Sequence, residues 1–340
     1  MQSALLEVND LKIEFMMRTG TVRAVQGISF QLQRGETVCL VGETGSGKSV
    51  TALSIIGLVG TGGRSHNVRI EGDIVYRPNK TKEYHMLELF PEEMRSLRGR
   101  EISMIFQEPM TCLNPVFTVG NQIAEVVIRH EATKTKHEAL RIAREMIQSV
   151  GIPEAELRLK SFPHQLSGGM RQRIMIAMAL ACRPAILIAD EPTAALDVTI
   201  QAQILNLIQR LQSELRTSVL FITHDLGVVA QIADRVVVMY AGRDVETGTV
   251  DEIFHSPLHP YTKSLLMSIP RLCKPGEKPE RLTPIGGTVP NPADLPPGCA
   301  FHPRCLWATD ARCSREEPEV EVSDTGHSVK CWRWRDLQEV

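Results

Sequence analysis

The chain has 340 residues, 43% of them hydrophobic and 23% charged, and a formal net charge of −2. This is the composition of a globular protein with room for two or more domains, and its charge balance excludes a general attraction to nucleic acid or to anionic lipid. The sequence lacks a secretion signal at its start and any run near the roughly 18 apolar residues of a membrane-spanning helix, so we expect a protein that is cytosolic or docks on a membrane through partners.

Short apolar runs alternate with helical stretches along the chain, which is typical of an α/β fold. The first run, ETVCLVG at 36–42, predicts a buried strand that leads into a glycine-rich loop and then a helix. A later segment predicts a hairpin with its turn at Ala241-Gly242. The further runs that predict strands are EISMIF (101–106), AILIAD (185–190), SVLFIT (218–223) and the two arms of RVVVMYAGRDVETG (235–248).

The pattern changes twice along the chain. From about Asn121 to Val150 it becomes helical, which predicts a helical subdomain inserted between strands. After about Pro270, proline, glycine and cysteine become frequent and long apolar runs disappear. We therefore expect a main domain at 1–265, with its helical subdomain at about 108–165, and a small C-terminal extension at 266–340.

The loop after the first buried strand, GETGSGKS, matches the phosphate-binding pattern G-x-x-x-x-G-K-[ST]. Its glycines allow backbone N–H groups to surround phosphate, Lys48 can reach the β and γ phosphates, and the Ser49 hydroxyl can ligate Mg²⁺. A chance match in such a chain has a probability on the order of one per cent, and the strand–loop–helix context lowers it further. The predicted nucleotide contacts here are Gly42, Glu43, Thr44, Gly45, Ser46, Gly47, Lys48, Ser49 and Val50.

Polar residues follow three other predicted strands. Asp190 can hold Mg²⁺, and the adjacent Glu191 can polarise a water for attack on a γ-phosphate. His224 can donate to a γ-phosphate oxygen, and Gln107 can touch both Mg²⁺ and water. Taken singly, each has an alternative: a solvated carboxylate for Glu191, a structural role for His224 and a surface position for Gln107. Their joint occurrence favours an ATPase site.

The motifs GETGSGKS, FQEP, LSGGMRQR, ILIADEP, AALD and ITHD occur in this order over about residues 4–265. Six ordered motifs resemble the ATP-binding-cassette (ABC) family. The resemblance implies a P-loop NTPase fold, with a RecA-like core and a helical subdomain. It also implies a head-to-tail dimer that holds ATP between the two chains.

The same resemblance implies roles for individual residues. Lys48, Gln107, Glu191 and His224 are the expected catalytic set, in which Gln107 matches the Q-loop, Glu191 the catalytic base and His224 the switch histidine. Asp190 matches the Walker B carboxylate and, with Ser49 and Gln107, is expected to hold Mg²⁺.

Other residues match motifs that face the second cassette or the base of the nucleotide. Ser167, Gly168 and Gly169 resemble the signature loop, which meets the γ-phosphate bound by the opposite subunit. Asp197 matches the D-loop at the dimer interface. Phe15 is the candidate for stacking on adenine, and core packing is its equally weighted alternative.

The class of cassette follows from what the sequence includes and lacks. It has one cassette and no inserted coiled coil, which disfavours the translation-factor and chromosome types, and nucleic acid is not an expected partner. QEPMTCLNPVFTVGNQIAE, AALDVTIQAQIL and HSPLHPYTKSLLMSIP resemble the ATPases of dipeptide and oligopeptide permeases, with nickel and glutathione importers as close relatives. The alternative is a soluble ABC ATPase without a transport role.

The permease resemblance implies an import ATPase that energises uptake of dipeptides or oligopeptides. Its expected partners are two transmembrane permease subunits, a second and different ABC ATPase subunit, and indirectly an extracytoplasmic substrate-binding protein. A homodimer of this chain is the alternative to the pair of different ATPase subunits. The expected location is the cytoplasmic face of the cell membrane. Apolar residues near 110–120 are a candidate groove for a coupling helix of a membrane subunit.

Four cysteines are gathered in the C-terminal extension with the spacing C-x5-C-x7-C-x17-C, which differs from the paired C-x2-C of zinc ribbons. The permease resemblance implies a [4Fe–4S] cluster in some members, and four thiolates are its usual complement. A Zn²⁺ site, unligated thiols and a disulfide are the alternatives. The candidate ligands are Cys299, Cys305, Cys313 and Cys331.

Overall fold

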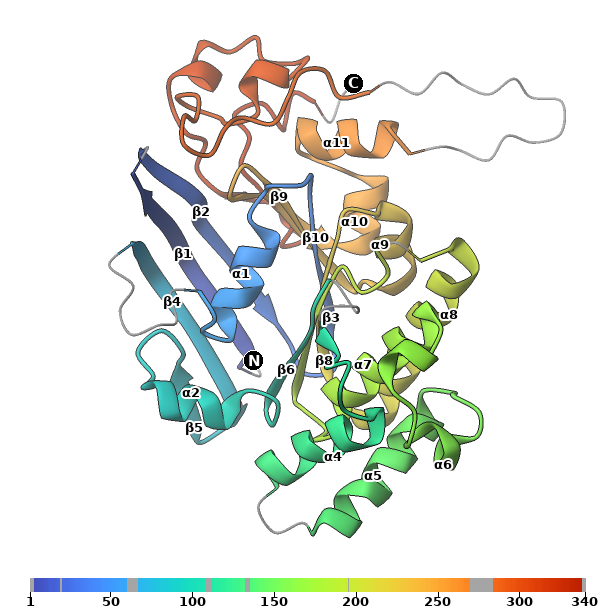
Figure 1. Ribbon diagram of the computed structural model, residues 1–340. Helices are drawn as coiled ribbons and strands as arrows, with labels where there is room; N and C mark the ends of the chain where they lie inside the picture. Colours follow the sequence, from blue (N-terminus) through green and yellow to red (C-terminus); the bar gives the residue numbers. More distant parts are fainter. Residues whose placement is uncertain are drawn as a thin grey trace, which may run out of the picture.

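The computed structural model describes residues 3–18, 20–59, 67–107, 112–131, 135–194, 196–269 and 284–337. Within these residues the larger sheet has eight strands in the order β11-β12-β10-β9-β3-β8-β7-β6. Figure 1 labels five of these strands, β3, β6, β8, β9 and β10. Strands β9, β3, β8, β7 and β6 are parallel, and β10, β12 and β11 extend the sheet with antiparallel pairs. The bounds are β3 (Thr37–Val41), β6 (Ile102–Ile105), β7 (Ile186–Asp190), β8 (Ser218–Thr223), β9 (Arg235–Tyr240), β10 (Arg243–Thr249), β11 (Glu321–Val322) and β12 (Ser328–Val329).

The predicted strands and the hairpin are confirmed. Every residue of β3, β7 and β8 is buried, as a continuous apolar run requires when a parallel sheet is covered on both faces. Strands β9 and β10 are joined at Ala241 and Gly242, whose positive φ values of 48° and 84° suit a two-residue hairpin turn.

A smaller antiparallel sheet has the strand order β2-β1-β4-β5. Helix α1 (Lys48–Ile55) shares one hydrophobic core with both sheets: its Ala52 and Ile55 pack in a cluster with Val8 of the smaller sheet and Leu40 of the larger one. Helix α2 (Pro91–Leu97) follows the smaller sheet and leads to β6. The strands are β1 (Leu6–Met17), β2 (Gly20–Leu32), β4 (Val68–Asn79) and β5 (Lys82–His85).

Helices form the region between β6 and β7, and the predicted helical stretch is confirmed by α4 and α5. Residues 108–111, where the predicted subdomain begins, lie outside the described residues. The helices here are α4 (Val119–His130), α5 (Lys136–Ser149), α6 (Ala155–Arg158), the 3-10 turn η1 (Pro163–Gln165) and α7 (Gly168–Leu180). The later helices are α8 (Val198–Leu215), α9 (Leu226–Ile232), α10 (Val250–His255) and α11 (Pro260–Met267). Among the described residues, no helix is both long enough and apolar enough to cross a membrane.

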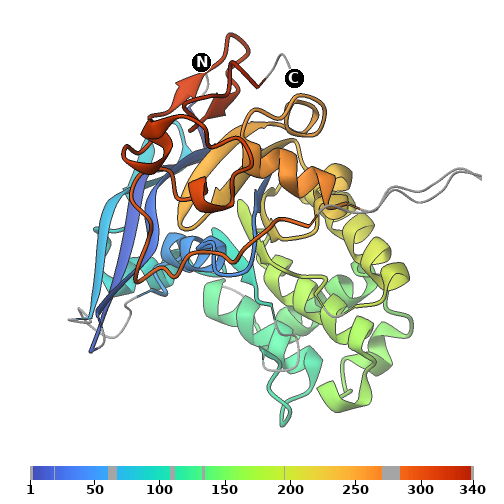
Figure 2. The ribbon, with the colours of Figure 1, turned by 90° about the horizontal axis from the view of Figure 1, so that it is seen from above.

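The C-terminal residues 284–337 pack against the β10 edge of the larger sheet and beside β2 (Figure 2). They contain the 3-10 turns η2 (His302–Arg304) and η3 (Ala311–Ser314) as well as β11 and β12. Two polar contacts attach them to β10: the buried His327 Nε2 lies 2.8 Å from Glu246 Oε1, and Lys330 Nζ pairs with Asp244 Oδ1 at 2.6 Å. The segment is therefore continuous with the sheet that carries the predicted ATPase motifs.

Candidate active site

The four predicted catalytic residues lie at one edge of the larger sheet. Lys48 follows β3 by the glycine-rich loop, Gln107 follows β6, Glu191 follows β7 and His224 follows β8. Because these strands are parallel neighbours, their carboxyl ends meet at the same edge, where open α/β sheets bind ligands. The order of the strands thus brings together residues that are up to 176 positions apart (224 minus 48) in the sequence.

The glycine-rich loop surrounds the amino group of Lys48. Lys48 is only 5% exposed, and its Nζ donates to the carbonyl oxygens of Gly42 at 2.7 Å and Glu43 at 3.0 Å and to Ser46 Oγ at 3.2 Å. Burial lowers the pKa of Lys48, and the charges of Glu191 and other nearby carboxylates oppose that shift. These hydrogen bonds fix the position of the amino group within a loop whose N–H groups suit phosphate.

Two loop positions require glycine because other backbone lies close to them. A Cβ on Gly42 would lie 2.1 Å from the carbonyl oxygen of Met239, and one on Gly47 would lie 2.5 Å from that of Ala24. Gly47 also has a φ of 98°, which an L side chain rarely adopts. The loop is therefore wedged between the β9–β10 hairpin and β2.

The predicted magnesium ligands are partly brought together. Ser49 Oγ donates to Asp190 Oδ1 at 3.0 Å, so a hydroxyl and a carboxylate converge at the start of α1. Burial raises the pKa of Asp190 above its usual value, and the hydrogen bond from Ser49 opposes this shift. Hard oxygen donors of this kind suit Mg²⁺.

The carboxylate of Glu191 is held on both of its oxygens. Gln107 Nε2 donates to Oε2 at 2.9 Å, and His224 Nδ1 lies 3.0 Å from Oε1. The Glu191 side chain is 15% exposed, whereas that of His224 is 60% exposed. Glu191 also has a φ of 44°, a strained conformation that turns the chain sharply at the end of β7. The arrangement is an oriented carboxylate with one face toward solvent.

The signature and D-loop residues lie at two helix starts that touch. Ser167 caps α7 by accepting the N–H of Met170 at 3.3 Å, and Asp197 caps α8 by accepting that of Ile200 at 2.9 Å. A Cβ on Gly169 would lie 3.2 Å from a side-chain carbon of Ile200. Ser167, Gly168 and Asp197 are exposed, so these polar groups are open to solvent or to a second chain.

Three further predicted nucleotide contacts have different environments. Thr44 is exposed at the tip of the loop, and Val50 is partly buried against the core shared by the two sheets. Phe15 lies on β1, opposite Val22 and Val68, and packs against the same core. This packing agrees with the core-packing alternative for Phe15, and the stacking of Phe15 on adenine stays a prediction.

Two residues that contact the loop were missed by sequence reasoning. The backbone N–H of Glu43 donates to the Tyr261 hydroxyl at 3.0 Å. Arg304 binds the Glu43 carboxylate with two hydrogen bonds, Nη1 to Oε2 at 2.7 Å and Nη2 to Oε1 at 3.1 Å. The run HPYTKSLL signals a helix that begins with proline, and a lone arginine among cysteines carries no pattern. Neither feature of the sequence indicates a contact with the glycine-rich loop.

The four C-terminal cysteines line one cavity of about 20 Å³, together with aromatic side chains that include Phe301 and Trp332. Cys299, Cys305, Cys313 and Cys331 form no disulfide with one another. Burial raises the pKa of the Cys305 thiol to about 11 and that of Cys331 to about 12. Among the described residues, no three His, Cys, Asp or Glu side chains are positioned to hold a metal ion.

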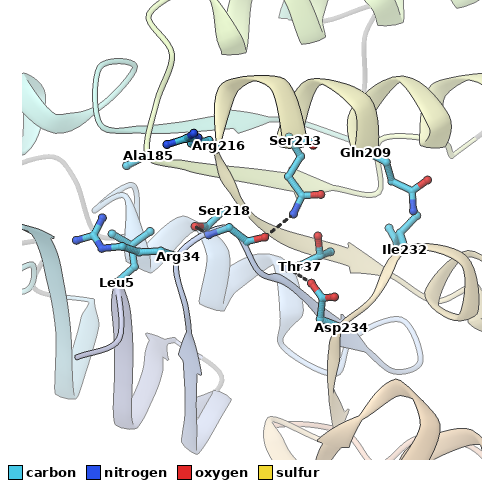
Figure 3. A pocket seen from close by; sticks show the side chains of 12 residues that line it. Leu5, Arg34, Thr37, Ala185, Gln209, Ser213, Arg216, Ser218, Ile232 and Asp234 are labelled. Atoms are coloured by element: carbon cyan, nitrogen blue, oxygen red, sulfur yellow. Dashed lines mark hydrogen bonds between the residues drawn. The ribbon is translucent and has the colours of Figure 1, made fainter. Parts of the chain in front are cut away.

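A larger hollow of about 700 Å³ lies at the opposite end of the sheet, by the amino ends of β3 and β8 (Figure 3). Its polar side chains bond nearby backbone: Asp234 accepts the N–H of Thr37 at 2.7 Å, and Gln212 donates to the carbonyl of Gly35 at 2.9 Å. These bonds brace the turn before β3. The candidate functional site is therefore at the carboxyl ends of the strands.

Comparison with known proteins gives two family matches. The family described as ABC transporter matches residues 25–194, and the oligopeptide/dipeptide transporter C-terminal region matches residues 245–313. The oligopeptide transport ATP-binding protein AppD of Bacillus subtilis (strain 168) is 51% identical over 334 residues, which cover 98% of each chain. The dipeptide transport ATP-binding protein DppD of the same organism is 51% identical over 329 residues, 96% of this chain and 94% of the relative.

Solved structures agree with the fold. The dimeric post-hydrolysis structure of the ATP-binding cassette MJ0796, bound to ADP and Pi, has a TM-score of 0.61 and 27% identity, covering 72% of this chain and 98% of that chain. The structure of cbiO1 from Clostridium perfringens, part of the ABC transporter complex cbiONQ, has a TM-score of 0.60 and 27% identity, covering 75% and 92%.

Proposed function

The chain belongs to the ABC transporter family, and we propose that it is the ATP-hydrolysing subunit that drives import of dipeptides or oligopeptides through separate transmembrane subunits. The match of residues 245–313 to the peptide-transporter C-terminal region supports this cargo. The observation that carries the ATPase function is the Glu191 carboxylate, held by Gln107 and His224 at the same sheet edge as the phosphate-binding loop.

In the proposed reaction, a water oxygen attacks the γ-phosphorus of ATP while Glu191 accepts a proton from that water, and the bond to the ADP oxygen breaks. The products are ADP and phosphate. Gln107 and His224 orient the Glu191 carboxylate before ATP binds, which reduces reorganisation during proton transfer. Lys48 supplies a positive charge for the β and γ phosphate oxygens.

The residues at the start of α1 fit Mg²⁺, because Ser49 and Asp190 offer oxygen donors that already converge. When bound, the ion neutralises charge on the phosphate oxygens. Gln107 uses its amide nitrogen on Glu191, which leaves its amide oxygen as a further ligand. Asp190, with its pKa raised by burial, gains a cationic partner in this arrangement.

A second ATPase chain, different or identical, completes the proposed site. The exposed N-terminus of α7, which carries Ser167 and Gly168, is the surface that we assign to the γ-phosphate bound by the other chain. Asp197, exposed at the start of α8, is assigned to the interface between the two chains. The dimeric form of the MJ0796 cassette supports this assembly. Binding of ATP between two chains and its hydrolysis would close and reopen the pair.

The proposed membrane partners are two transmembrane permease subunits, supplied by an extracytoplasmic substrate-binding protein, with this chain on the cytoplasmic face. Within the predicted coupling groove, Leu113 and Val119 are buried in the helical core, whereas Val116 is 70% and the adjacent Phe117 is 51% exposed. Val116 and Phe117 are therefore the residues that we assign to a membrane subunit.

We further propose that the four C-terminal cysteines hold a [4Fe–4S] cluster, with Zn²⁺ as the alternative. Four thiol donors lining one cavity support this proposal. The cavity of about 20 Å³ has room for about one water, and its thiols are not placed to hold a metal ion, so they must rearrange to bind either group. Iron, zinc and acid-labile sulfide measured on anaerobically purified protein decide between them, and absence of all three contradicts both.

The proposed function is tested by purifying the tagged chain from its own membranes in mild detergent. We expect two integral membrane proteins to copurify. Proteoliposomes containing this complex should take up a labelled dipeptide or oligopeptide with ATP, and Glu191→Gln should stop uptake while ATP still binds. Uptake of nickel or glutathione in place of peptide would contradict the proposed peptide cargo. A purely soluble complex without membrane subunits would contradict the transport role.

A further inference from the structure

We propose that Arg304 is a positioning residue of the ATP site: it holds the Glu43 carboxylate away from the bound phosphates and thereby makes the cysteine-rich segment part of the nucleotide-binding site. This inference rests on the proposed role of the loop in binding ATP and adds to it a residue from outside the cassette motifs. Arg304 lies 261 residues after Glu43 in the sequence.

The contact between Arg304 and Glu43 is specific in its geometry. The two parallel hydrogen bonds, at 2.7 Å and 3.1 Å, are the bidentate pairing in which a guanidinium orients a carboxylate. The Arg304 side chain is 5% exposed, so the pair is shielded from water on the arginine side. Such shielding makes the pairing stronger than one on the open surface.

Arg304 is itself fixed by other groups. Its Nε donates to the carbonyl of Gly286 at 2.8 Å, and Nη1 also donates to the Tyr240 hydroxyl at 3.3 Å. Phe301, in the same segment, packs against the rings of Tyr240 and Tyr261 at centroid distances of 5.2 Å and 5.3 Å. The guanidinium therefore presents a rigid fork to the loop.

The position of Glu43 explains why the loop needs this contact. Its carbonyl accepts from Lys48 Nζ and its N–H donates to Tyr261, so the residue lies within the bonded framework of the loop. A carboxylate so close to a triphosphate is electrostatically unfavourable unless a cation neutralises it. Without Arg304, the Glu43 carboxylate would repel the phosphates or compete with them for Lys48.

Residues that line the cysteine cavity are close neighbours of Arg304 in the sequence. Arg304 ends the turn η2, between Cys299 and Cys305, which both line the cavity. The carbonyl of Cys299 accepts from the N–H of His302 at 3.0 Å, at the start of that turn. The turn that carries Arg304 is therefore joined on both sides to residues of the cavity wall.

The test is a comparison of ATP affinity, by titration with a fluorescent ATP analogue, in the purified full-length chain and its variants. Arg304→Ala should weaken binding about tenfold, because it leaves an unneutralised carboxylate in the loop. Adding Glu43→Gln to Arg304→Ala should restore most of the affinity, because the repelling charge is then gone. Arg312→Ala is the matched control, since Arg312 pairs with Asp310 on the exposed surface of the same segment.

Each outcome is decisive. Unchanged affinity in Arg304→Ala, or a double variant as weak as Arg304→Ala, would overturn the inference, because a purely structural role is not rescued by removing a charge. If Arg304→Ala does not fold, Arg304→Lys keeps the charge without the bidentate fork and should weaken binding about threefold; unchanged binding there overturns the inference. Failure of the unaltered chain to bind ATP would instead refute the proposed function.

Discussion

His259 should make the stability of this protein depend on pH between about 6.5 and 4. The side chain is 1% exposed, and its Nδ1 accepts the N–H of Tyr261 at the start of α11. Burial lowers the pKa of His259 from 6.5 to about 4, with the charge of Glu246 opposing the shift. A histidine whose pKa is lowered by folding destabilises the native state as the pH falls, because the unfolded chain takes up the proton first.

The magnitude follows from the two pKa values. The contribution of His259 to the free energy of unfolding is fully present above pH 6.5 and is lost as the pH falls to about 4. The loss amounts to about 3 kcal/mol. The assay is urea unfolding, followed by far-UV circular dichroism, at a series of pH values from 7.5 to 4.

The matched variant is His259→Asn, since asparagine is a good helix N-cap and does not titrate. Carboxylates titrate in both proteins, so the difference between the two pH profiles isolates His259. We expect the unaltered chain to lose about 3 kcal/mol more than the variant across this window. Parallel profiles would refute the reasoning that burial keeps His259 neutral.

Three further predictions concern the site and its scaffold. Glu191→Gln should lower ATP turnover by about 10² to 10⁴-fold in a phosphate-release assay while ATP binding is kept, because an amide cannot accept the proton; equal loss of binding would contradict this role. Gly42→Ala should lower both ATP affinity and the melting temperature, since its Cβ would meet the Met239 carbonyl at 2.1 Å, whereas Gly286→Ala has open space and should melt as the unaltered chain does. Thr135→Ala should cost about 1 kcal/mol in chemical unfolding, because Thr135 and Glu138 form the capping box of α5; an unchanged midpoint would show that this cap contributes nothing.

Much of the predicted catalytic set follows from local sequence. A continuous apolar run predicts a strand buried on both faces, and the polar residue at its end then lies at the strand's carboxyl end. This logic applies to Gln107, Glu191 and His224, and the loop pattern adds Lys48. Because the carboxyl ends of neighbouring parallel strands lie at the same end of the sheet, residues that are distant in sequence become neighbours in space. For Phe15, the same local reasoning left two roles open, because an aromatic residue on a strand can either pack in the core or stack on a ligand.

Only the tertiary structure decided which residues outside these motifs support the loop. Tyr261 and Arg304 reach Glu43 from 218 and 261 positions away. Tyr261 lies on α11, whereas Arg304 lies on the C-terminal segment, which the pairing of β12 with β10 and the contacts of His327 and Lys330 hold against the sheet. Side-chain identity and periodicity carry information about neighbours within one element. The partner of a single arginine in a loop is set by the packing of whole elements, so its position had to be read from the folded chain.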